Sequence, residues 1–533
     1  SHPTPPGPRL RRLDALSVSV MPRGVRPGSH GPIPPHPNSR LRMNDSNPTS
    51  IPVGRCRSLP ALTVLAFAAA FAPYAGSTAE PPPNVIVILA DDLGYGDLSP
   101  FGAQDIPTPN LGRLANEGRT FVNFHVSQAV CSASRASLLT GSYPPRVGIA
   151  GALMPDATTG LAADETTLPE LLRARGYATG MAGKWHLGHH PPFLPLRHGF
   201  DEYFGIPYSN DMWPATVRPG GAKPFGPLPL IEGDRIVRPE VTPEDQAHFS
   251  RDFSARAVDF IRRNAARPFF FYVAHPMPHV PLFASEAFRG RSGRGLYGDV
   301  VMELDAGVGA ILDELDRQQL AGRTWVIFLS DNGPWLSYGS HAGSAGPFRE
   351  GKHTNWEGGT RVPCVMRWPG RLPAGTTGDA MLMTIDLLPT IARIVGAPPP
   401  GLPIDGRDVW PLLAGDADAR HPHEAYAFYG GSGQLQAVTT ADGAWKLVLP
   451  HAYITKAGQP TTDDGRAIPM TRATVEVPEL YRLRHDPGEM RNVAAEYPEV
   501  VARLLAFAER TRDELGDTAQ SRPGRANRAP GRL

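Results

Sequence analysis

The chain contains four short runs of mainly apolar residues, and each run ends abruptly in polar side chains. The first run, NVIVILA at 84–90, is rich in β-branched residues, as is typical of a strand buried on both faces of a parallel sheet. Helix-like segments separate the runs; for example, Phe253, Ala257, Phe260 and Ile261 recur at the spacing of one helix face. Alternating strands and helices predict an α/β fold with a large, mostly parallel central sheet flanked by helices. The four predicted strands are 84–90, 177–182, 269–274 and 324–330.

Start and stop signals mark several helices between these strands. Thr108 and Pro109 predict a helix start, with Thr as the N-cap and Pro in the first turn. Thr167 and Glu170 have the spacing of a capping box, and Gly176 predicts the end of that helix. One further apolar stripe predicts a long helix through Val301, Leu304, Val308, Ile311, Leu312 and Leu315.

The C-terminal third has a different pattern, with shorter strands and more turns. The predicted elements are a helix at 386–395, a Pro- and Asp-rich linker at 401–423, strands at 445–449 and 479–483, and a helix at 498–512. We therefore predict a large α/β domain at 80–420 and a small C-terminal subdomain at 421–515, with an antiparallel sheet and a helix. The basic, Gly- and Pro-containing residues 516–533 are predicted to be disordered.

The first 79 residues differ in composition from the rest. They contain nine of the chain's 53 Lys and Arg residues but only two of its 52 acidic residues, so the remainder is net acidic and offers no basic face for nucleic acid. Residues 1–42 have no apolar period and are predicted to be disordered or a non-native upstream segment. Residues 43–79 combine arginines, a short apolar run and small residues, which predicts a signal peptide and export to the periplasm or outside the cell, without stable membrane insertion. An uncleaved anchor is the alternative.

Hard oxygen ligands follow two of the predicted strands. Asp91 and Asp92 end the first, and Asp331 and Asn332 end the last. Ligands of parallel sheets bind beyond the carboxyl ends of the strands, so these residues are expected to meet. Such oxygens suit Ca²⁺ or Mg²⁺ better than zinc. A solvated turn is the alternative for the Asp pair alone.

A cysteine lies at the start of another predicted helix. Cys56 is in the leader, so Cys131 and Cys364 remain, and no disulfide framework is predicted. Arg135 follows Cys131 by four residues and faces the same side of the helix. A helix N-terminus beside an arginine favours an anion. A buried structural cysteine is the alternative.

Lysines and histidines complete the candidate chemistry. Lys184 and His186 alternate along a segment predicted to be extended, and His279 and Lys352 lie in Pro- and Gly-containing loops. Cations hold the oxygens of a tetrahedral anion, and histidines transfer protons near neutral pH. Together with the predicted metal site, these residues predict metal-assisted cleavage of an anionic ester, with phosphate and sulfate both possible.

Longer motifs narrow this choice. From about residue 84 to 492 the chain resembles the formylglycine-dependent sulfatases of the alkaline-phosphatase-like superfamily, and within them the arylsulfatase A and N-acetylgalactosamine-6-sulfatase group. The motifs that carry the resemblance are NVIVILADDLGYGD, CSASRASLLTG, TGMAGKWHLG, GFDEYFGIPYSND, SDNG, GKHTNWEGGTRVP and LYRLRHDPGEMRN.

The resemblance implies a role for each candidate residue. Cys131 corresponds to the cysteine that is oxidised to formylglycine by a formylglycine-generating or anaerobic sulfatase-maturating enzyme. The matches to the family's metal ligands, with Ca²⁺ expected and Mg²⁺ possible, are Asp91, Asp92, Asp331, Asn332 and the modified Cys131. The matches to catalytic and sulfate-binding residues are Arg135, Lys184, His186, Ser209, His279 and Lys352.

The chemistry implied by the resemblance is covalent. The hydrated aldehyde attacks sulfur and forms a sulfo-enzyme intermediate, while His279, helped by Lys352, protonates the leaving alcohol. His186 then deprotonates the second hydroxyl, which expels inorganic sulfate. An unmodified thiol has no second hydroxyl and is not regenerated this way.

One position departs from the family pattern, and the motifs do not identify the substrate. Ala133 stands where proline is usual, which leaves open which maturation enzyme acts. An aryl or carbohydrate sulfate is expected, in a pocket lined by loops at 209–229 and 334–349. The rival hypotheses are a phosphate or phosphonate hydrolase on the same fold and a non-catalytic anion- or glycan-binding relative.

Overall fold

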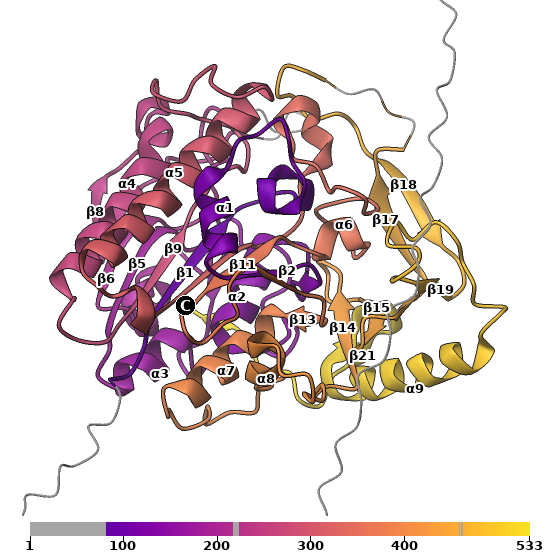
Figure 1. Ribbon diagram of the computed structural model, residues 1–533. Coiled ribbons are helices and arrows are strands. Elements are labelled where there is room, and N and C mark those ends of the chain that lie inside the picture. The colour runs from indigo at the N-terminus through magenta and orange to yellow at the C-terminus, as the bar shows by residue number, and fades with distance from the viewer. Residues whose placement is uncertain (1–80, 217–222, 458, 460–461) are drawn as a thin grey trace, which may run out of the picture. The chain divides into compact units, whose positions relative to one another are not determined.

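A ten-stranded mixed sheet lies at the centre of the computed structural model, which describes residues 81–216, 223–457, 459 and 462–533 (Figure 1). In spatial order its strands are β12 (Thr376–Gly378), β2 (Arg119–Phe121), β11 (Cys364–Arg367), β10 (Thr324–Ser330), β1 (Asn84–Ala90), β9 (Phe269–Ala274), β5 (Ala178–Lys184), β6 (Glu202–Ile206), β7 (Leu230–Glu232) and β8 (Arg235–Arg238). The middle strands β10, β1, β9, β5 and β6 are parallel, and they include the four strands predicted from the sequence. The α/β prediction is therefore confirmed. The predictions for 1–42 and 43–79 lie outside the described residues.

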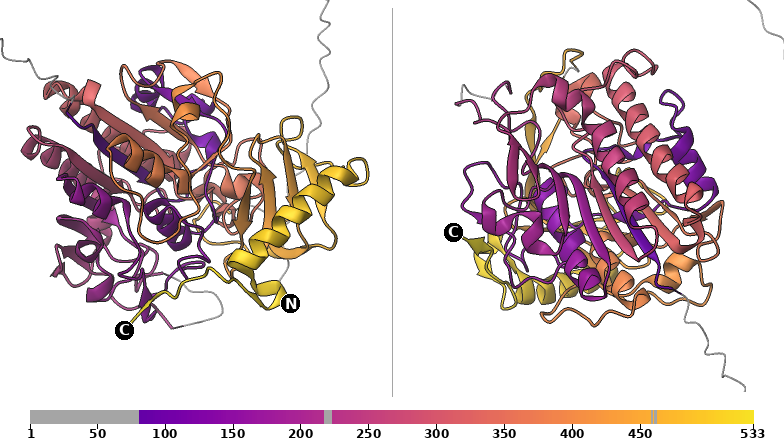
Figure 2. Two further views of the ribbon diagram at one scale, coloured as in Figure 1. Left: turned by 90° about the horizontal axis from the view of Figure 1, so that it is seen from below. Right: turned by 90° about the vertical axis from the view of Figure 1, so that its left-hand side faces the viewer.

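Helices cover both faces of this sheet because its central strands are apolar on both sides. Along β1, Val85 and Val87 pack into one core cluster and Ile86 and Ile88 into another. The first face is covered by α2 (Cys131–Thr140), α3 (Leu168–Ala174) and α7 (Leu387–Ile394), and the second by α1 (Pro109–Asn116), α4 (Pro243–Arg263) and α5 (Gly295–Arg317) (Figures 1 and 2). The sheet thus forms the middle of three layers.

The helix-start predictions hold, with one difference in capping. At α3, the Thr167 hydroxyl and the Glu170 carboxylate form the predicted capping box. Helix α1 begins at Pro109, but the Thr108 side chain bonds Ser99 instead of capping the helix.

A smaller antiparallel sheet follows in the C-terminal part. Its strands are β14 (Ala425–Tyr429), β15 (Leu435–Thr440), β16 (Trp445–Val448) and β19 (Glu479–Arg482). Helix α9 (Pro498–Leu515) packs against it through Leu504 and Ala508 (Figure 2). The described residues also form four two-stranded pairs: β13 (Leu382–Met383) with β3 (Phe124–His125), β17 (His451–Thr455) with β18 (Thr471–Val475), β20 (Gly516–Asp517) with β21 (Arg522–Pro523), and β22 (Gly531–Arg532) with β4 (Thr159–Gly160).

Two predictions of irregular chain are wrong. The segment 401–423, predicted as a linker, contains helix α8 (Trp410–Ala414), whose Leu413 is buried in the core because it packs on the first face of the large sheet. The tail 516–533, predicted to be disordered, is held by the β22–β4 pairing and by an ion pair between Arg528 and Glu165 at 2.6 Å. The basic side chains that led to the prediction of disorder pair with carboxylates, as Arg528 does with Glu165 and Arg522 with Glu509.

Within the described part of the chain, no helix combines the length and apolar character needed to cross a membrane.

Candidate active site

The candidate residues converge at the carboxyl ends of the central strands. Strands β1 and β10 run parallel in register, with Ala90 opposite Ser330, so the residues that follow both strands meet at one edge of the sheet. Strand β5 ends at Lys184 two places along the same edge, beyond β9. Helix α2 brings Cys131 and Arg135 to this edge from the first face, because both lie in its N-terminal half and are buried.

A buried ion cluster links these four elements, β1, β10, β5 and α2. Lys184 Nζ lies 2.5 Å from Asp91 Oδ2 and donates to Ser209 Oγ at 3.0 Å. Arg135 Nη2 lies 2.9 Å from Asp331 Oδ2 and 3.3 Å from Asp91 Oδ2. Charge-assisted contacts of this kind hold the side chains in fixed positions.

A second group of contacts adjoins the first. Lys352 Nζ lies 2.7 Å from Asp92 Oδ1, and His279 Nε2 lies 3.5 Å from Asp92 Oδ2. The His279 ring donates from Nδ1 to the carbonyl of Val280 at 2.5 Å, which leaves Nε2 facing the cluster. Asn332 Nδ2 lies 2.6 Å from Asp92 Oδ1. The Asp92 amide donates to Asp331 Oδ1 at 3.2 Å, so the two groups form one continuous cluster. Of the predicted residues, Cys131 and His186 have no direct contact with it among the described interactions, and they are linked to it by the charges of Lys184 and its neighbours.

Asp91 and Asp331, the two carboxylates beside Arg135, have pKa values shifted in opposite directions. Burial alone would raise the pKa of Asp91, but Lys184 and Arg135 outweigh it and hold that pKa well below its usual range. Burial and the neighbouring Asp91 charge raise the pKa of Asp331 to about 7. Asp91 is thus the carboxylate that stays ionised most firmly.

The Cys131 side chain is not in a thiolate-forming environment. Burial raises its pKa, and the opposing effect of Lys184 and Lys352 is smaller. The second buried cysteine, Cys364, lies in β11 and has its pKa raised well above the usual value by burial alone. An unmodified Cys131 is therefore a neutral thiol at physiological pH.

His186 differs from the prediction in its backbone but not in its surroundings. It has a φ of +61°, so the Lys184–His186 segment is not extended as predicted. Trp185, between them, points away from the site, because its Nε1 donates to the carbonyl of Phe193 at 2.8 Å in the core. His186 Nε2 bonds the Leu153 carbonyl at 2.9 Å, and among the described residues its buried Nδ1 has no hydrogen-bond partner. Burial, with Lys184 and Arg135, holds the pKa of His186 well below its usual value, so the ring is neutral.

Several oxygens at this edge fit a divalent cation. Asp91 Oδ1 and Asn332 Oδ1 are buried and accept no hydrogen bond from any residue that the structure describes. One ligand atom from each of Asp91, Asp92 and His279 lies within 4.8 Å of the others. Carboxylate and amide oxygens are the donors that Ca²⁺ and Mg²⁺ prefer. The sequence did not predict His279 in this group, and Asp331 is turned towards Arg135.

Sequence reasoning missed the aromatic wall of the site. The Trp335 ring lies 4.5 Å from Lys352 Nζ and 5.4 Å from the His279 ring. The sequence placed Trp335 in a predicted lining loop, 334–349, but gave this residue no role of its own. It fixes the orientation of both a cation and an imidazole, through a cation–π contact and a ring contact.

Buried cations, carboxylates and histidines at the carboxyl edge of the parallel strands are the groups that hydrolysis of an anionic ester requires. The comparisons with known proteins specify the ester. A sulfatase family model matches residues 83–397, and a model for the C-terminal region of N-sulphoglucosamine sulphohydrolase matches 350–449.

Individual relatives agree with these models. Arylsulfatase A from Homo sapiens is 40% identical over 452 residues, covering 81% of this chain and 88% of its own. N-acetylgalactosamine-6-sulfatase from Canis lupus familiaris is 36% identical over 472 residues, covering 82% of this chain and 87% of its own. The crystal structure of the sulfatase PsFucS1 from Pseudoalteromonas sp. matches with a TM-score of 0.72 and 25% identity, covering 84% of this chain and 92% of its own. The chain belongs to the sulfatase family, and it is an enzyme that hydrolyses sulfate esters.

Proposed function

We propose that the enzyme cleaves a sulfate monoester at the carboxyl edge of the central sheet, with residue 131 as the nucleophile after its oxidation to formylglycine. The observation that carries this proposal is the position of Cys131. It is buried at the start of α2, close enough to Lys184 and Lys352 for their charges to act on its side chain, and yet its pKa is raised. A buried neutral thiol is a poor nucleophile, whereas the hydrate of an aldehyde at this place supplies one hydroxyl to attack sulfur and a second to expel sulfate.

The charges of the site favour an anionic substrate once a cation is bound. The carboxylates of Asp91, Asp92 and Asp331 face three cationic side chains, Arg135, Lys184 and Lys352. A divalent cation held by Asp91, Asp92 and Asn332 makes the cluster net positive. When bound, such an ion, for which Ca²⁺ fits the oxygen donors well, stabilises negative charge on the nucleophile and on the sulfate oxygens.

Lys184 and Ser209 are proposed to hold the sulfate group. Their side chains are bonded to each other at 3.0 Å and both are buried, so they present donors at a fixed distance. Arg135 is already engaged by Asp331 and by the Lys184 carbonyl, to which its Nη1 donates at 2.8 Å. We assign Arg135 to positioning residue 131 and Asp331.

His186 has the protonation state of a base. Its Nε2 hydrogen is donated to Leu153, so the free lone pair is on Nδ1, which is buried and without a partner among the described residues. A pKa held well below the usual value keeps this lone pair available. We propose that Nδ1 takes the proton of the second hydroxyl of residue 131 when sulfate leaves.

His279 and Lys352 are proposed to assist the leaving alcohol. His279 Nε2 faces the cluster beside Asp92, and Lys352 contacts the same carboxylate. A proton given from Nε2 to the ester oxygen neutralises the alkoxide as the S–O bond breaks. Lys352 stays protonated because Asp92 outweighs burial and raises its pKa, so it serves as an electrostatic partner.

The test measures sulfate release and the chemistry of residue 131 on the same protein sample. Protein made in a host that matures sulfatases should release sulfate from 4-nitrophenyl sulfate, and mass spectrometry of the peptide with residue 131 should show the aldehyde. Turnover by protein whose residue 131 is entirely thiol would refute the mechanism. Faster release of phosphate than of sulfate from matched esters would favour the rival phosphatase. Export from the cell, expected from residues 43–79, remains a prediction.

A further inference from the structure

The loop between α2 and α3 contains a short main-chain segment, 151–153, that contacts two parts of the proposed site. The Leu153 amide donates to Ser132 Oγ at 3.0 Å, and Ser132 directly follows the cysteine at the start of α2. The Leu153 carbonyl accepts from His186 Nε2 at 2.9 Å. A single residue of this loop thus joins the helix of the proposed nucleophile to the proposed base, although neither Leu153 nor Ser132 takes part in the chemical steps proposed above.

The position of this segment is set by its contacts with the start of α2 and with the core. Gly151 is held twice, because its amide donates to Gln128 Oε1 at 2.7 Å and its carbonyl accepts from the Ala133 amide at 3.2 Å. Leu153 is held by the Ser132 hydroxyl and by its own side chain, which packs against the core on the first face of the large sheet. Ser132 is fully buried, so its hydroxyl is a fixed anchor for the segment.

The two ends of the loop are fixed by contacts of their own. Towards α2, Arg146 Nη2 lies 2.6 Å from a carboxylate oxygen of Glu514. Towards α3, strand β4 pairs with β22. Loss of the Ser132 bond is therefore expected to shift Leu153 locally without unfolding the loop.

The Leu153 carbonyl determines which nitrogen of His186 can act as a base. A carbonyl oxygen only accepts hydrogen bonds, so Nε2 carries the ring hydrogen and the free lone pair is on Nδ1. Without this acceptor the ring is free to turn, and the tautomer with its hydrogen on Nδ1 becomes accessible. That tautomer has no lone pair on Nδ1 and cannot take a proton there.

We propose that Ser132 is a positioning residue for the second chemical step, because it holds the Leu153 carbonyl against His186. This inference rests on the function proposed above. In that step the proton of the second hydroxyl of residue 131 moves to His186 Nδ1, and the O–H electron pair forms the C=O bond of the aldehyde. The C–O bond to the sulfate group breaks, and sulfate leaves with the electron pair of that bond. Ser132 acts on this step through Leu153 and not by contact with the reacting atoms.

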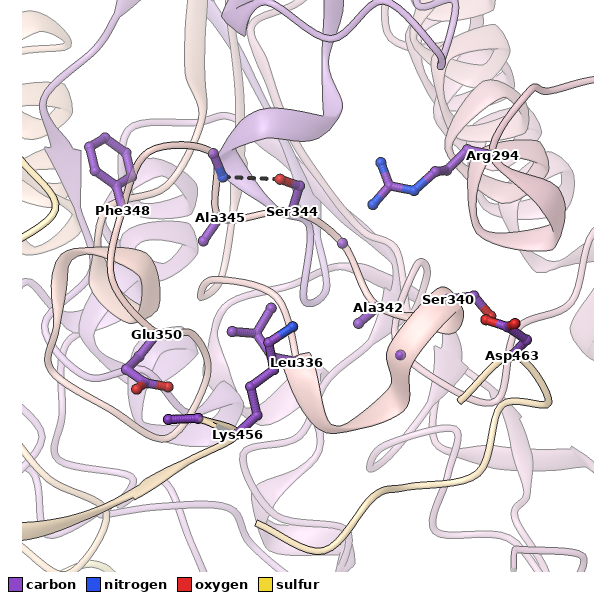
Figure 3. Close-up of a pocket in the computed structure, with 14 residues that line it drawn as sticks. Arg294, Leu336, Ser340, Ala342, Ser344, Ala345, Phe348, Glu350, Lys456 and Asp463 are labelled. Atoms are coloured by element: carbon purple, nitrogen blue, oxygen red, sulfur yellow. Dashed lines mark hydrogen bonds between the residues drawn. The ribbon is translucent and has the colours of Figure 1, made fainter. Parts of the chain in front are cut away.

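A serine in another loop makes a bond of the same kind that stays local. Ser344 lines a cavity of about 610 Å³ beside the 3₁₀ helix η7 (Leu336–His341), and its hydroxyl accepts from the Gly346 amide at 3.1 Å (Figure 3). Its donor and acceptor are two positions apart in the chain, so the bond stabilises one turn. The Ser132 bond joins residues 21 positions apart, and one of them contacts His186, which favours a positioning role.

The test separates the two chemical steps. For an aryl sulfate, kcat/KM reports the steps up to departure of the alcohol, whereas kcat also includes the loss of sulfate from residue 131. The substrate is 2,4-dinitrophenyl sulfate, whose alcohol leaves readily. Ser132→Ala should lower kcat by about 10- to 100-fold and change kcat/KM by less than about twofold, because His186 acts only after the alcohol has left. Rates are expressed per aldehyde, measured by peptide mass spectrometry, since Ser132 lies in the cysteine motif.

A double-mutant cycle tests whether Ser132 acts through His186. The sulfated form of the residue 131 peptide is followed by rapid quenching and mass spectrometry. His186→Ala should slow the loss of sulfate from this peptide, and Ser132→Ala should slow it no further in that background. Leu153→Ala, outside the cysteine motif, removes the packing that supports the same carbonyl and should lower kcat in the same way, by about 3- to 10-fold.

Ser137→Ala is the matched control. The Ser137 hydroxyl is also buried in α2 but accepts from Ser127 Oγ at 2.7 Å, so this variant should retain kcat. Proportional losses of kcat and kcat/KM in Ser132→Ala, an unchanged kcat, or additive effects in the cycle would overturn the positioning role and leave the sulfatase mechanism intact. Wild-type protein that carries the aldehyde but shows no turnover, or undiminished sulfate loss in His186→Ala, would instead refute the proposed mechanism. Thermal unfolding verifies that each variant is folded.

Discussion

Among the described residues, two of the buried clusters of charge are built differently. One is the active-site cluster around Asp91 and Lys184. The other, which we call the Glu357 cluster, consists of His125, Glu357, Lys446 and Glu489 and joins α6 (Glu357–Thr360), close to the Lys352 loop, to the C-terminal sheet.

In the Glu357 cluster the carboxylate oxygens all contact donors. Lys446 Nζ lies 2.9 Å from Glu357 and 2.9 Å from Glu489, His125 Nε2 lies 3.1 Å from Glu357, and the Glu357 amide donates to Glu489 at 2.7 Å. Burial would raise the pKa of Glu357, but Lys446 and His125 hold it well below its usual value.

In the active-site cluster, by contrast, several lone pairs have no donor. Asp91 Oδ1, Asn332 Oδ1 and His186 Nδ1 are buried without partners among the described residues. The Glu357 cluster also contains two buried atoms without a hydrogen-bond partner among the described residues, His125 Nδ1 and Glu489 Oε1, but Glu489 Oε1 already lies 2.9 Å from Lys446 Nζ. In the active-site cluster the unpartnered atoms are two oxygens and a histidine nitrogen that can meet a cation and a substrate. The two clusters therefore differ in where their unpartnered atoms lie, and buried charge alone does not separate a site from a structural network.

The largest effect is expected from Cys131→Ala. It should reduce sulfate release by more than about 10⁴-fold, because no other side chain in the proposed mechanism supplies the nucleophile. The measurement is kcat/KM for 4-nitrophenyl sulfate, with circular dichroism to verify the fold. Cys364→Ala is the matched control, since it removes the other buried thiol, in β11, and should retain turnover. Comparable losses in both variants would show that the effect is one of packing.

Lys446→Met should break the Glu357 cluster. Two buried carboxylates would lose their shared cation, which is expected to lower the free energy of unfolding by about 3–5 kcal/mol. Chemical denaturation measures the change. Arg510→Met is the control, because its pair with Glu424 is 2.6 Å long but exposed, and the expected loss is below about 1 kcal/mol. Equal losses for the two variants would contradict the structural role given to this cluster.

Removal of divalent cations should act on the active-site cluster alone. Chelation with EDTA should lower turnover, and Ca²⁺ or Mg²⁺ should restore it. Binding at 100 times the dissociation constant stabilises the folded state by about 2.7 kcal/mol, so the unfolding temperature should also fall on chelation. The Asp91→Asn variant tests the ligand assignment directly. Isothermal titration calorimetry should show that it binds Ca²⁺ more weakly than the wild-type protein does. Undiminished Ca²⁺ binding by this variant would contradict the ligand assignment.

Most of the framework was predictable because apolar patterning dictates it. Strands β1 and β10 have the predicted bounds, since residues buried on both faces leave an uninterrupted apolar run. The predicted site residues also meet, because parallel strands place their carboxyl ends together. Other features depend on contacts distant in sequence and leave no local pattern. Glu357 meets Lys446 across 89 residues, and Arg528 meets Glu165 across 363. The left-handed backbone of His186 has only a weak signal in its residue type, since non-glycine residues, histidine included, seldom adopt it.

The smallest effect concerns Ala133, where the family pattern has proline. The Ala133 amide donates to the Gly151 carbonyl at 3.2 Å, and proline has no such hydrogen. Losing this bond is expected to lower the free energy of unfolding by about 1 kcal/mol, partly offset by the stiffer unfolded chain, so Ala133→Pro should fold. If the oxygen-dependent generator reads the proline, this variant should carry a larger fraction of aldehyde at residue 131, measured by peptide mass spectrometry. Turnover per aldehyde should stay constant, since the Ala133 side chain carries no polar atom that could take part in the proposed chemistry. An unchanged aldehyde fraction would mean that Ala133 replaces proline without effect on maturation, and a fall in turnover per aldehyde would show that the Gly151 contact positions residue 131 itself.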